Sequence, residues 1–163
     1  MIALVQRARS ARVRVGGATV GEIGPGLLVL LGVLAGDTPA EARWLAGKTA
    51  ALRVFPDPDG RPGGRMNRSL VDVRGDALVV SQFTLAGDVS RGTRPSFARA
   101  APPETARALY EQYVRELEAA LGRPVPTGRF GAEMEVTLVG DGPVTLWLSR
   151  APRDAPGDAP GGA

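Results

Sequence analysis

The pattern of apolar and polar residues in the first part of the chain predicts short strands separated by turns. Residues 2–6 and 11–15 have the alternation of two strands, and we expect a polar turn at residues 7–10 between them. After a glycine pair, residues 18–23 are expected to fold back as a hairpin partner. Residues 27–34 form an almost unbroken apolar run, which indicates a central strand covered on both faces.

Two helices follow from local signals. Thr38 offers a hydroxyl N-cap, Pro39 occupies the first helical position, and Glu41 lies three residues after the cap. The first helix should therefore begin here and end near Ala51. A second helix is expected over residues 103–121, where apolar side chains recur at spacings of three and four on one face.

The remaining apolar runs predict four more strands. Residues 56–67 are dense in proline, glycine and aspartate and are expected to be a loop, whereas the chain from Arg150 lacks any periodicity and favours a disordered tail. The four strands are expected at residues 52–55, 77–80, 133–139 and 144–148.

This order of strands, helix, strands, helix and strands predicts one α/β domain of the α+β type, with a mixed, barrel-like sheet and both helices on one side. The length of 163 residues is enough for one domain and too short for two ordinary ones. A hydrophobic content of 44% with 23% charged residues is typical of globular proteins. No apolar run is long enough to span a membrane and the start lacks a leader pattern, so we expect a cytoplasmic location without a membrane partner.

The absence of two residue types excludes most familiar catalytic designs. The chain has no cysteine and no histidine, which removes disulfides, thiol nucleophiles, imidazole bases and the usual zinc sites. Any catalysis must therefore use carboxylates, hydroxyls, amides, arginines, the backbone or the substrate itself. We expect neither a metal nor another cofactor.

A polar segment at the end of a predicted buried strand is the first candidate site. Ser81, Gln82, Phe83 and Thr84 follow the apolar run 77–80, and buried polar groups are costly unless they are paired or used. The plain alternative is a strand end whose hydroxyls bond to neighbouring backbone groups. Thr84 as a nucleophile is disfavoured, because in the absence of histidine only a lysine or a carboxylate is left as its base.

A second candidate is the dipeptide Gly142-Pro143. Taken alone it is an ordinary turn between two strands. Proline is also the residue whose preceding bond adopts the cis form easily, and a glycine before it lets a backbone carbonyl approach a ligand closely. A cis bond at this pair would let its backbone alone read the shape of a ligand.

Arginines supply the remaining candidates. Arg7 at the end of the first strand is ordinarily just solvated. Arg91, Arg94 and Arg99 surround Phe97 in an irregular basic segment, which suits phosphate contact but also an ordinary solvated surface. The net charge of +3 is compatible with a polyanionic partner without identifying one.

Several short motifs, in order along residues 1–148, resemble the D-aminoacyl-tRNA deacylases, also known as the D-tyrosyl-tRNA deacylase family. Each motif is weak alone, and their order over nearly the whole chain is what makes the resemblance specific. They are Gln6-Arg7, residues 26–33, Arg65-Met66-Asn67, residues 81–86, Arg91-Gly92, residues 94–97, residues 127–132 with Met134, and residues 141–145.

The resemblance implies a domain over residues 1–149, a tail over 150–163, and a homodimer with active sites at the subunit interface. Ser81, Gln82, Phe83 and Thr84 would form the catalytic floor of the pocket. The residues expected to bind the substrate are Gly142 and Pro143, joined by a cis bond and inserted from the partner subunit, Arg7, which would orient the Gly-Pro carbonyls, and Phe130 and Met134.

The reaction implied is hydrolysis of the ester between a D-amino acid and the terminal ribose of tRNA, with glycyl-tRNA also accepted and L-aminoacyl-tRNA rejected. The 2′-hydroxyl of that ribose would help to activate water, while backbone N–H groups near Phe83 hold the oxyanion. In this family Thr84 has also been regarded as the nucleophile. Aminoacyl-tRNA would be the nucleic-acid partner, and DNA is not expected.

One position departs from the family pattern. Gly140 stands two residues before the glycine of the Gly-Pro pair, where the family usually has asparagine. Two other functions remain open at this point: a non-catalytic module that binds tRNA or protein, and an esterase for small molecules that uses Thr84.

Overall fold

A computed structural model describes residues 1–58 and 65–152 of the chain. The elements follow the order strands, helix, strands, helix and strand, as the apolar pattern indicates. The strands form one main sheet and a second sheet of only two strands. The elements are β1 (Ile2–Val15), β2 (Ala18–Ile23), β3 (Gly26–Gly32), α1 (Pro39–Ala51), β4 (Phe55–Pro56), β5 (Met66–Arg68), β6 (Asp76–Ser81), the 3₁₀ turn η1 (Phe83–Ala86), α2 (Pro103–Leu121) and β7 (Glu135–Ser149).

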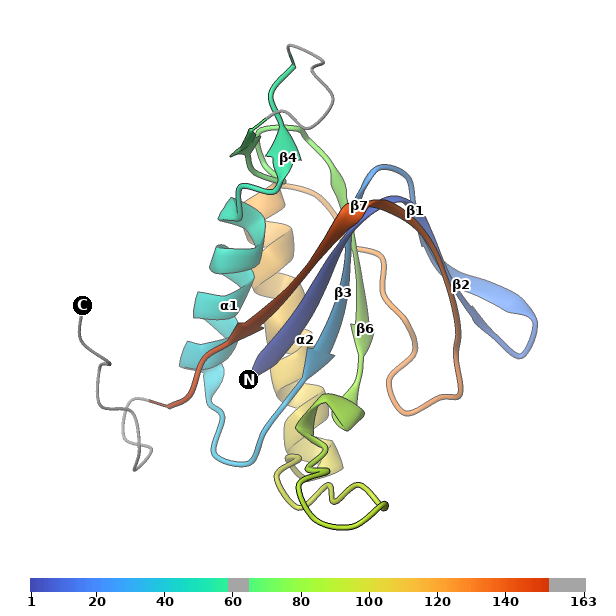
Figure 1. Ribbon diagram of the computed structural model, residues 1–163, viewed down its shortest axis with the longest axis vertical. Coiled ribbons are helices and arrows are strands. Elements are labelled where there is room, and N and C mark those ends of the chain that lie inside the picture. The colour runs from blue at the N-terminus through green and yellow to red at the C-terminus, as the bar shows by residue number, and fades with distance from the viewer. Residues whose placement is uncertain (59–64, 153–163) are drawn as a thin grey trace.

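The main sheet is mixed, as predicted. Its strands run in the order β2-β1-β3-β6, and β7 pairs with β1. The pair β3·β6 is parallel, and the other pairs of this sheet are antiparallel. Both helices lie side by side on one face of the sheet (Figure 1), and Tyr113 Oη donates to Thr49 Oγ1 at 2.8 Å between them. The expectation of one α+β domain with two helices on one side is confirmed.

The turn predicted at residues 7–10 is wrong, because β1 continues without a break from Ile2 to Val15. Its first half pairs with β3, its second half with β2, and β7 pairs with both halves. The polar residues of the predicted turn therefore keep strand hydrogen bonds, and the strand adjusts there through register shifts between Gln6 and Ala8 and between Ala8 and Ser10.

Two other strand predictions need correction. The strands expected at 133–139 and 144–148 are one strand, β7, which passes through the Gly142-Pro143 pair while staying antiparallel to β1. The strand expected at 52–55 is displaced, since β4 covers only Phe55–Pro56 and pairs with β5. In each case long-range pairing, and not the local apolar run, sets the limits of the strand.

Two clusters of apolar side chains hold the domain together. The larger lies between the sheet and the helices and includes Leu27, Val29, Leu45 and Tyr113, all essentially inaccessible. The smaller lies on the opposite face, where the curled sheet packs side chains such as Val13 and Leu78. Strand β3 is therefore covered on both faces, as its continuous apolar run predicts.

Helix α1 begins with the predicted capping box. Thr38 Oγ1 accepts from the backbone N–H of Ala40 at 3.2 Å, and Glu41 Oε2 accepts from the backbone N–H of Thr38 at 2.9 Å. Helix α2 ends at Gly122, whose φ of 67° is the left-handed conformation that glycine adopts without a steric penalty. Both helices thus have the limits that local signals predict.

The end of β7 is tied to the start of β1. The backbone N–H of Arg150 donates to Met1 O at 3.0 Å, and the guanidinium of Arg150 lies over the Trp44 ring at 4.7 Å. The tail expected from residue 150 lies mostly at 153–163, outside the described residues. Among the residues that the structure describes, no helix is long and apolar enough to cross a membrane.

Candidate active site

An apolar cavity opens where the parallel strands β3 and β6 end. Leu31 pairs with Ser81 in this register, and Gln82 N donates to Leu31 O at 2.8 Å immediately afterwards. Because parallel strands present their carboxyl ends at the same edge, the polar segment after β6 lies on that edge. Turn η1 then carries the chain away, and helix α2 forms the opposite wall.

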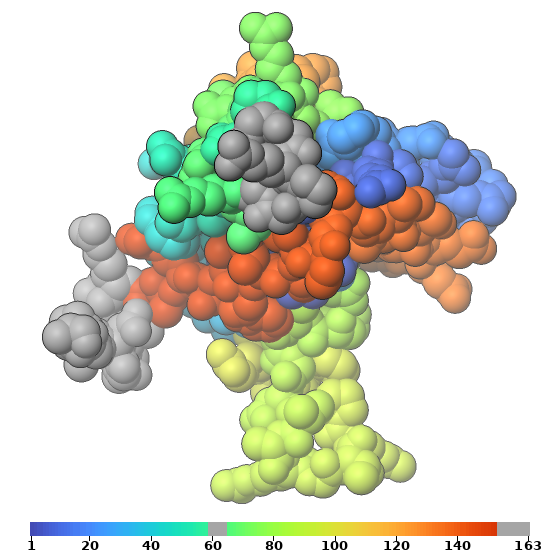
Figure 2. Space-filling model, turned by 45° about the horizontal axis from the view of Figure 1, so that its top comes forward, coloured from blue at the N-terminus to red at the C-terminus, as the bar shows by residue number. Residues whose placement is uncertain are grey.

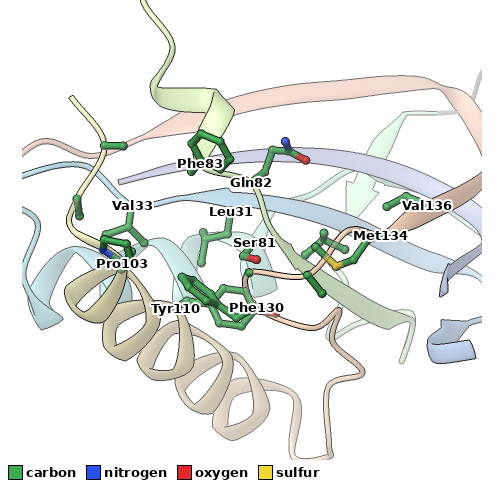
Figure 3. Close-up of a pocket in the computed structure, with 16 residues that line it drawn as sticks. Leu31, Val33, Ser81, Gln82, Phe83, Pro103, Tyr110, Phe130, Met134 and Val136 are labelled. Atoms are coloured by element: carbon green, nitrogen blue, oxygen red, sulfur yellow. The ribbon is translucent and has the colours of Figure 1, made fainter. Parts of the chain in front are cut away.

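The cavity measures about 510 Å³ and is mainly apolar. Figure 3 shows Ser81 near its centre, with the rings of Tyr110 and Phe130 on one side and Met134 on the other. Among the described residues that line it there is no carboxylate, arginine or lysine. The full lining consists of Leu31, Val33, Val80, Ser81, Gln82, Phe83, Ala100, Ala101, Pro103, Ala106, Tyr110, Phe130, Gly131, Ala132, Met134 and Val136.

Three of the four residues predicted as catalytic line this cavity, and Thr84 does not. Its side chain is exposed, and its hydroxyl accepts a hydrogen bond from Gln82 Nε2. Lys48 lies in the last turn of α1, the end of that helix farthest from η1 (Figure 1). Lys48 is therefore not placed to act as a base for Thr84. The Thr84 hydroxyl instead accepts the hydrogen bond that orients the Gln82 amide.

Phe83 is the exposed aromatic residue at the rim. Its side chain is 59% accessible, and its ring meets that of Phe97 edge-on at 5.0 Å between centroids. The backbone N–H groups of Phe83 and Thr84 begin η1, where the first N–H groups of a helical turn have no acceptor within that turn. This rim can therefore present backbone donors to a ligand.

Phe130 and Met134, predicted to bind substrate, both lie in the cavity wall. The Phe130 ring packs against Tyr110 at 5.8 Å and lies under the Arg107 guanidinium at 5.0 Å. Met134 approaches the backbone closely at Gly128, where a Cβ would come within 2.7 Å of its sulfur. A side chain at position 128 would therefore displace the Met134 thioether.

Tyr110 is a wall residue that sequence reasoning did not select. Its hydroxyl donates to Val79 O at 2.9 Å, and burial raises the pKa of this phenol to about 12. It is therefore neutral near pH 7 and already bonded to the backbone, which suits a structural role. Its only signal in the sequence is its place on the apolar face of α2, and this signal does not distinguish a cavity wall from ordinary core.

The Gly142-Pro143 pair forms a second, separate hollow of about 320 Å³. The peptide bond between them is cis, as expected. A Cβ on Gly142 would lie 2.1 Å from the backbone nitrogen of Val144, so no other residue fits this conformation. By contrast, a Cβ on Gly140 would meet nothing within 4 Å.

Arg7 was predicted to orient the carbonyls of the Gly-Pro pair, but its hydrogen bond goes to the residue before the pair, Asp141. Its Nε donates to Asp141 O at 2.9 Å and lies 3.0 Å from Asp141 Oδ2. A further hydrogen bond goes to Val54 O, and Arg9 Nε lies 3.6 Å from the other carboxylate oxygen of Asp141. The guanidinium therefore fixes Asp141, whose carbonyl immediately precedes the Gly-Pro pair.

The two candidate regions share no lining residue within one chain. Eight of the predicted residues are thus sorted into two groups, with Ser81, Gln82, Phe83, Phe130 and Met134 in the first cavity. Gly142 and Pro143 lie with Arg7 in the other hollow. A single chain does not bring the groups together.

The chain matches a known protein family over most of its length. The family model described as D-Tyr-tRNA(Tyr) deacylase matches residues 4–149. The chain belongs to this family. The earlier resemblance is therefore confirmed, and the matched residues contain both candidate regions.

Relatives and solved structures extend the match. A D-aminoacyl-tRNA deacylase of Salinibacter ruber is 60% identical over 92% of this chain and 97% of its own length. One of Dinoroseobacter shibae is 57% identical over 91% of this chain and 99% of its own. A solved structure named c-Myc DNA Unwinding Element Binding Protein is 39% identical, covers 93% of this chain and 100% of its own, and has a TM-score of 0.86. A probable eukaryotic D-amino acid tRNA deacylase, at 20% identity and a TM-score of 0.76 over 90% of this chain and 97% of its own, shares the fold.

Proposed function

We propose that this protein hydrolyses the ester bond between a D-amino acid and the terminal ribose of tRNA, accepts glycyl-tRNA, and rejects L-aminoacyl-tRNA. The observation that carries the proposal is the cavity floor, which in a chain of this family presents a hydroxyl, an amide and backbone N–H groups without a charged base. An ester is an activated carbonyl compound, so positioning of water and stabilisation of the oxyanion suffice for its hydrolysis.

In this proposal the substrate supplies the group that the protein lacks. The 2′-hydroxyl of the terminal ribose activates the attacking water, and the backbone N–H groups of Phe83 and Thr84 hold the oxyanion. Phe130 and Met134 give an apolar wall that suits the flat face of the terminal adenine. Ser81 and Gln82 orient the reacting ester.

Chirality is read by a second copy of the chain. The Gly142-Pro143 pair of the partner enters the cavity, and its carbonyls hold the amino group of a D-residue and leave no space for an L side chain. Glycine has no side chain to exclude and is therefore accepted. Arg7 and Asp141 keep the inserted segment in place through their hydrogen bond of 2.9 Å.

The exposed surface of β7 supports the homodimer that this site needs. Trp147 and Val139 on this strand are 54% and 50% accessible, and Val136 and Leu146 are also exposed. Large apolar side chains gathered on one exposed strand are typical of an interface. Because β7 also carries Gly142, an interface at this strand brings the Gly-Pro pair to the partner. The dimer acts in the cytoplasm, where aminoacyl-tRNA is used.

The test is release of labelled tyrosine from D-Tyr-tRNA, L-Tyr-tRNA and, in parallel, glycine from Gly-tRNA. We expect kcat/KM for the D-ester to exceed that for the L-ester by at least about 100-fold, because a steric block rejects more strongly than a missing contact. An Ala132→Trp variant, which fills the cavity, should lose all release. Equal release of D- and L-tyrosine, or binding of tRNA without turnover, would contradict the proposal.

A further inference from the structure

The segment 88–99, here called the arginine arm, projects from the body of the molecule beside the cavity. The chain leaves the cavity rim at Phe83, passes through η1 and the arm, and returns to the rim at Ala100. Figure 2 shows this part of the chain extending well away from the rest of the protein. Both ends of the arm are therefore fixed at the mouth of the cavity.

Hydrogen bonds set the direction of the arm. At its base Asp88 N donates to Ser96 O at 2.8 Å, and Ser96 N donates to Asp88 O at 2.9 Å. The Phe97 ring packs edge-on against Phe83, and Gly87 lies so close to this ring that a Cβ there would be 3.2 Å from it. The arm is thus anchored to the same aromatic side chain that forms the rim.

The arm is exposed and positively charged. Every residue from 88 to 99 is exposed. Its charged side chains are Arg91, Arg94, Arg99 and Asp88, which gives three positive charges less one negative, or +2, of a total of +3 for the chain. Within the described residues no salt bridge joins any of the three arginines to a carboxylate, whereas Asp88 Oδ1 accepts from the backbone N–H of Ser90 at 2.9 Å.

We infer that the arginine arm binds the phosphate backbone of the tRNA acceptor stem. This inference rests on the proposed function, in which the terminal aminoacyl-adenosine occupies the cavity. The nucleotides before it must then leave through the mouth, where they meet the arm. Arginine matches phosphate oxygens in charge and in the geometry of its N–H groups.

The arm differs from the surface that suits a second protein chain. Strand β7 exposes four large apolar side chains, as protein interfaces do, whereas the arm exposes three arginines beside two apolar side chains, Val89 and Phe97. Contacts to phosphate position a nucleic acid without reading its bases. The arm would therefore help the enzyme to bind many different tRNAs.

The experiment compares one variant on two substrates. Arg91→Ala/Arg94→Ala should lower kcat/KM for D-Tyr-tRNA about tenfold near 0.1 M salt and flatten its dependence on log salt by a slope of about two, because two phosphate contacts are lost. Turnover of 3′-O-(D-tyrosyl)adenosine, which has no phosphates, should not change. The control Lys48→Ala/Arg115→Ala removes the same charge from exposed helix positions and should leave both substrates unaffected.

Each other outcome overturns the inference. An equal loss of kcat/KM on both substrates would show that the arm affects the hydrolysis step. An unchanged kcat/KM on D-Tyr-tRNA would show that the arm does not bind the tRNA. Dissociation of the dimer in the arm variant, measured by mass, would assign the arm to the subunit interface. If the unmodified enzyme hydrolyses neither substrate, the proposed function itself fails, and this result is distinct from the others.

Discussion

At the scale of single residues, the chemistry of the cavity is defined by the groups that are missing. Its described lining contains one ionisable side chain, Tyr110, whose pKa is raised to about 12 by burial. Ser81 and Gln82 lie in the floor, while Thr84 is outside the lining and bonds to Gln82. A protein group that changes its charge near pH 7 is therefore not part of this floor.

This arrangement predicts the behaviour of Thr84→Ala. The variant should retain turnover of D-Tyr-tRNA within about threefold, because the hydroxyl lies outside the cavity and only orients the Gln82 amide. A substrate whose terminal ribose lacks the 2′-hydroxyl should in contrast react at least about 100-fold more slowly, as expected for loss of a general base. Single-turnover rates measure both. Complete loss of turnover in Thr84→Ala, together with an unchanged rate on the 2′-deoxy substrate, would instead support Thr84 as the nucleophile.

At the scale of elements, the helix limits follow from local chemistry and the strand limits do not. The cap at Thr38 and the end at Gly122 were predictable because each depends on residues within one turn. The continuity of β1 and β7 depends on hydrogen bonds between residues more than 100 positions apart, such as the Ala11–Leu138 pair. Polar residues inside these strands gave the opposite local signal.

The capping box gives a prediction at this scale. Thr38→Ala should cost about 1 kcal/mol of unfolding free energy at pH 7, because the Ala40 N–H loses its acceptor. Burial raises the pKa of Glu41, but hydrogen bonds from Thr38 outweigh it and leave this pKa below its usual value. The stabilisation by Glu41 is therefore complete above the unfolded pKa of about 4.3 and is lost as the pH falls through the lower folded pKa.

Urea unfolding of Glu41→Gln at several pH values measures this effect. The stability difference from the unmodified protein should be largest near neutral pH and should shrink as the solution becomes acidic. Glu104→Gln, at an exposed position in the first turn of α2, is the control and should show little difference at any pH. If this stability difference instead grew as the pH fell, the lowered pKa of Glu41 would be contradicted.

At the scale of the whole molecule, the two candidate regions lie apart within one chain, and the proposed active site needs two chains. Ala132→Trp fills the cavity of its own subunit, while Gly142→Ala distorts the segment given to the partner, since a Cβ would lie 2.1 Å from Val144 N. Each variant alone should be inactive. Mixed by co-refolding, half of the dimers are hybrids with one intact site, so about a quarter of the activity should return.

The measurement is turnover of D-Tyr-tRNA by the mixture, beside each variant refolded alone. Thermal melting of each variant checks that it folds. No recovery from a mixture that contains hybrid dimers would show that the cavity and the Gly-Pro segment do not act in the same site. A return of full activity would show that one of the variants was not defective.

The sequence by itself determined the elements governed by near neighbours, the central apolar strand, and the family to which the chain belongs. It also selected Ser81, Gln82, Phe83, Gly142 and Pro143, because polar residues after a buried strand and a glycine before proline are costly or unusual wherever they occur. Only the tertiary structure decided that β1 and β7 are single long strands. It also decided that Tyr110 forms a cavity wall, that Arg7 holds Asp141, and that Thr84 lies outside the cavity. These facts depend on which distant segments meet, and spacing along a chain does not contain that information.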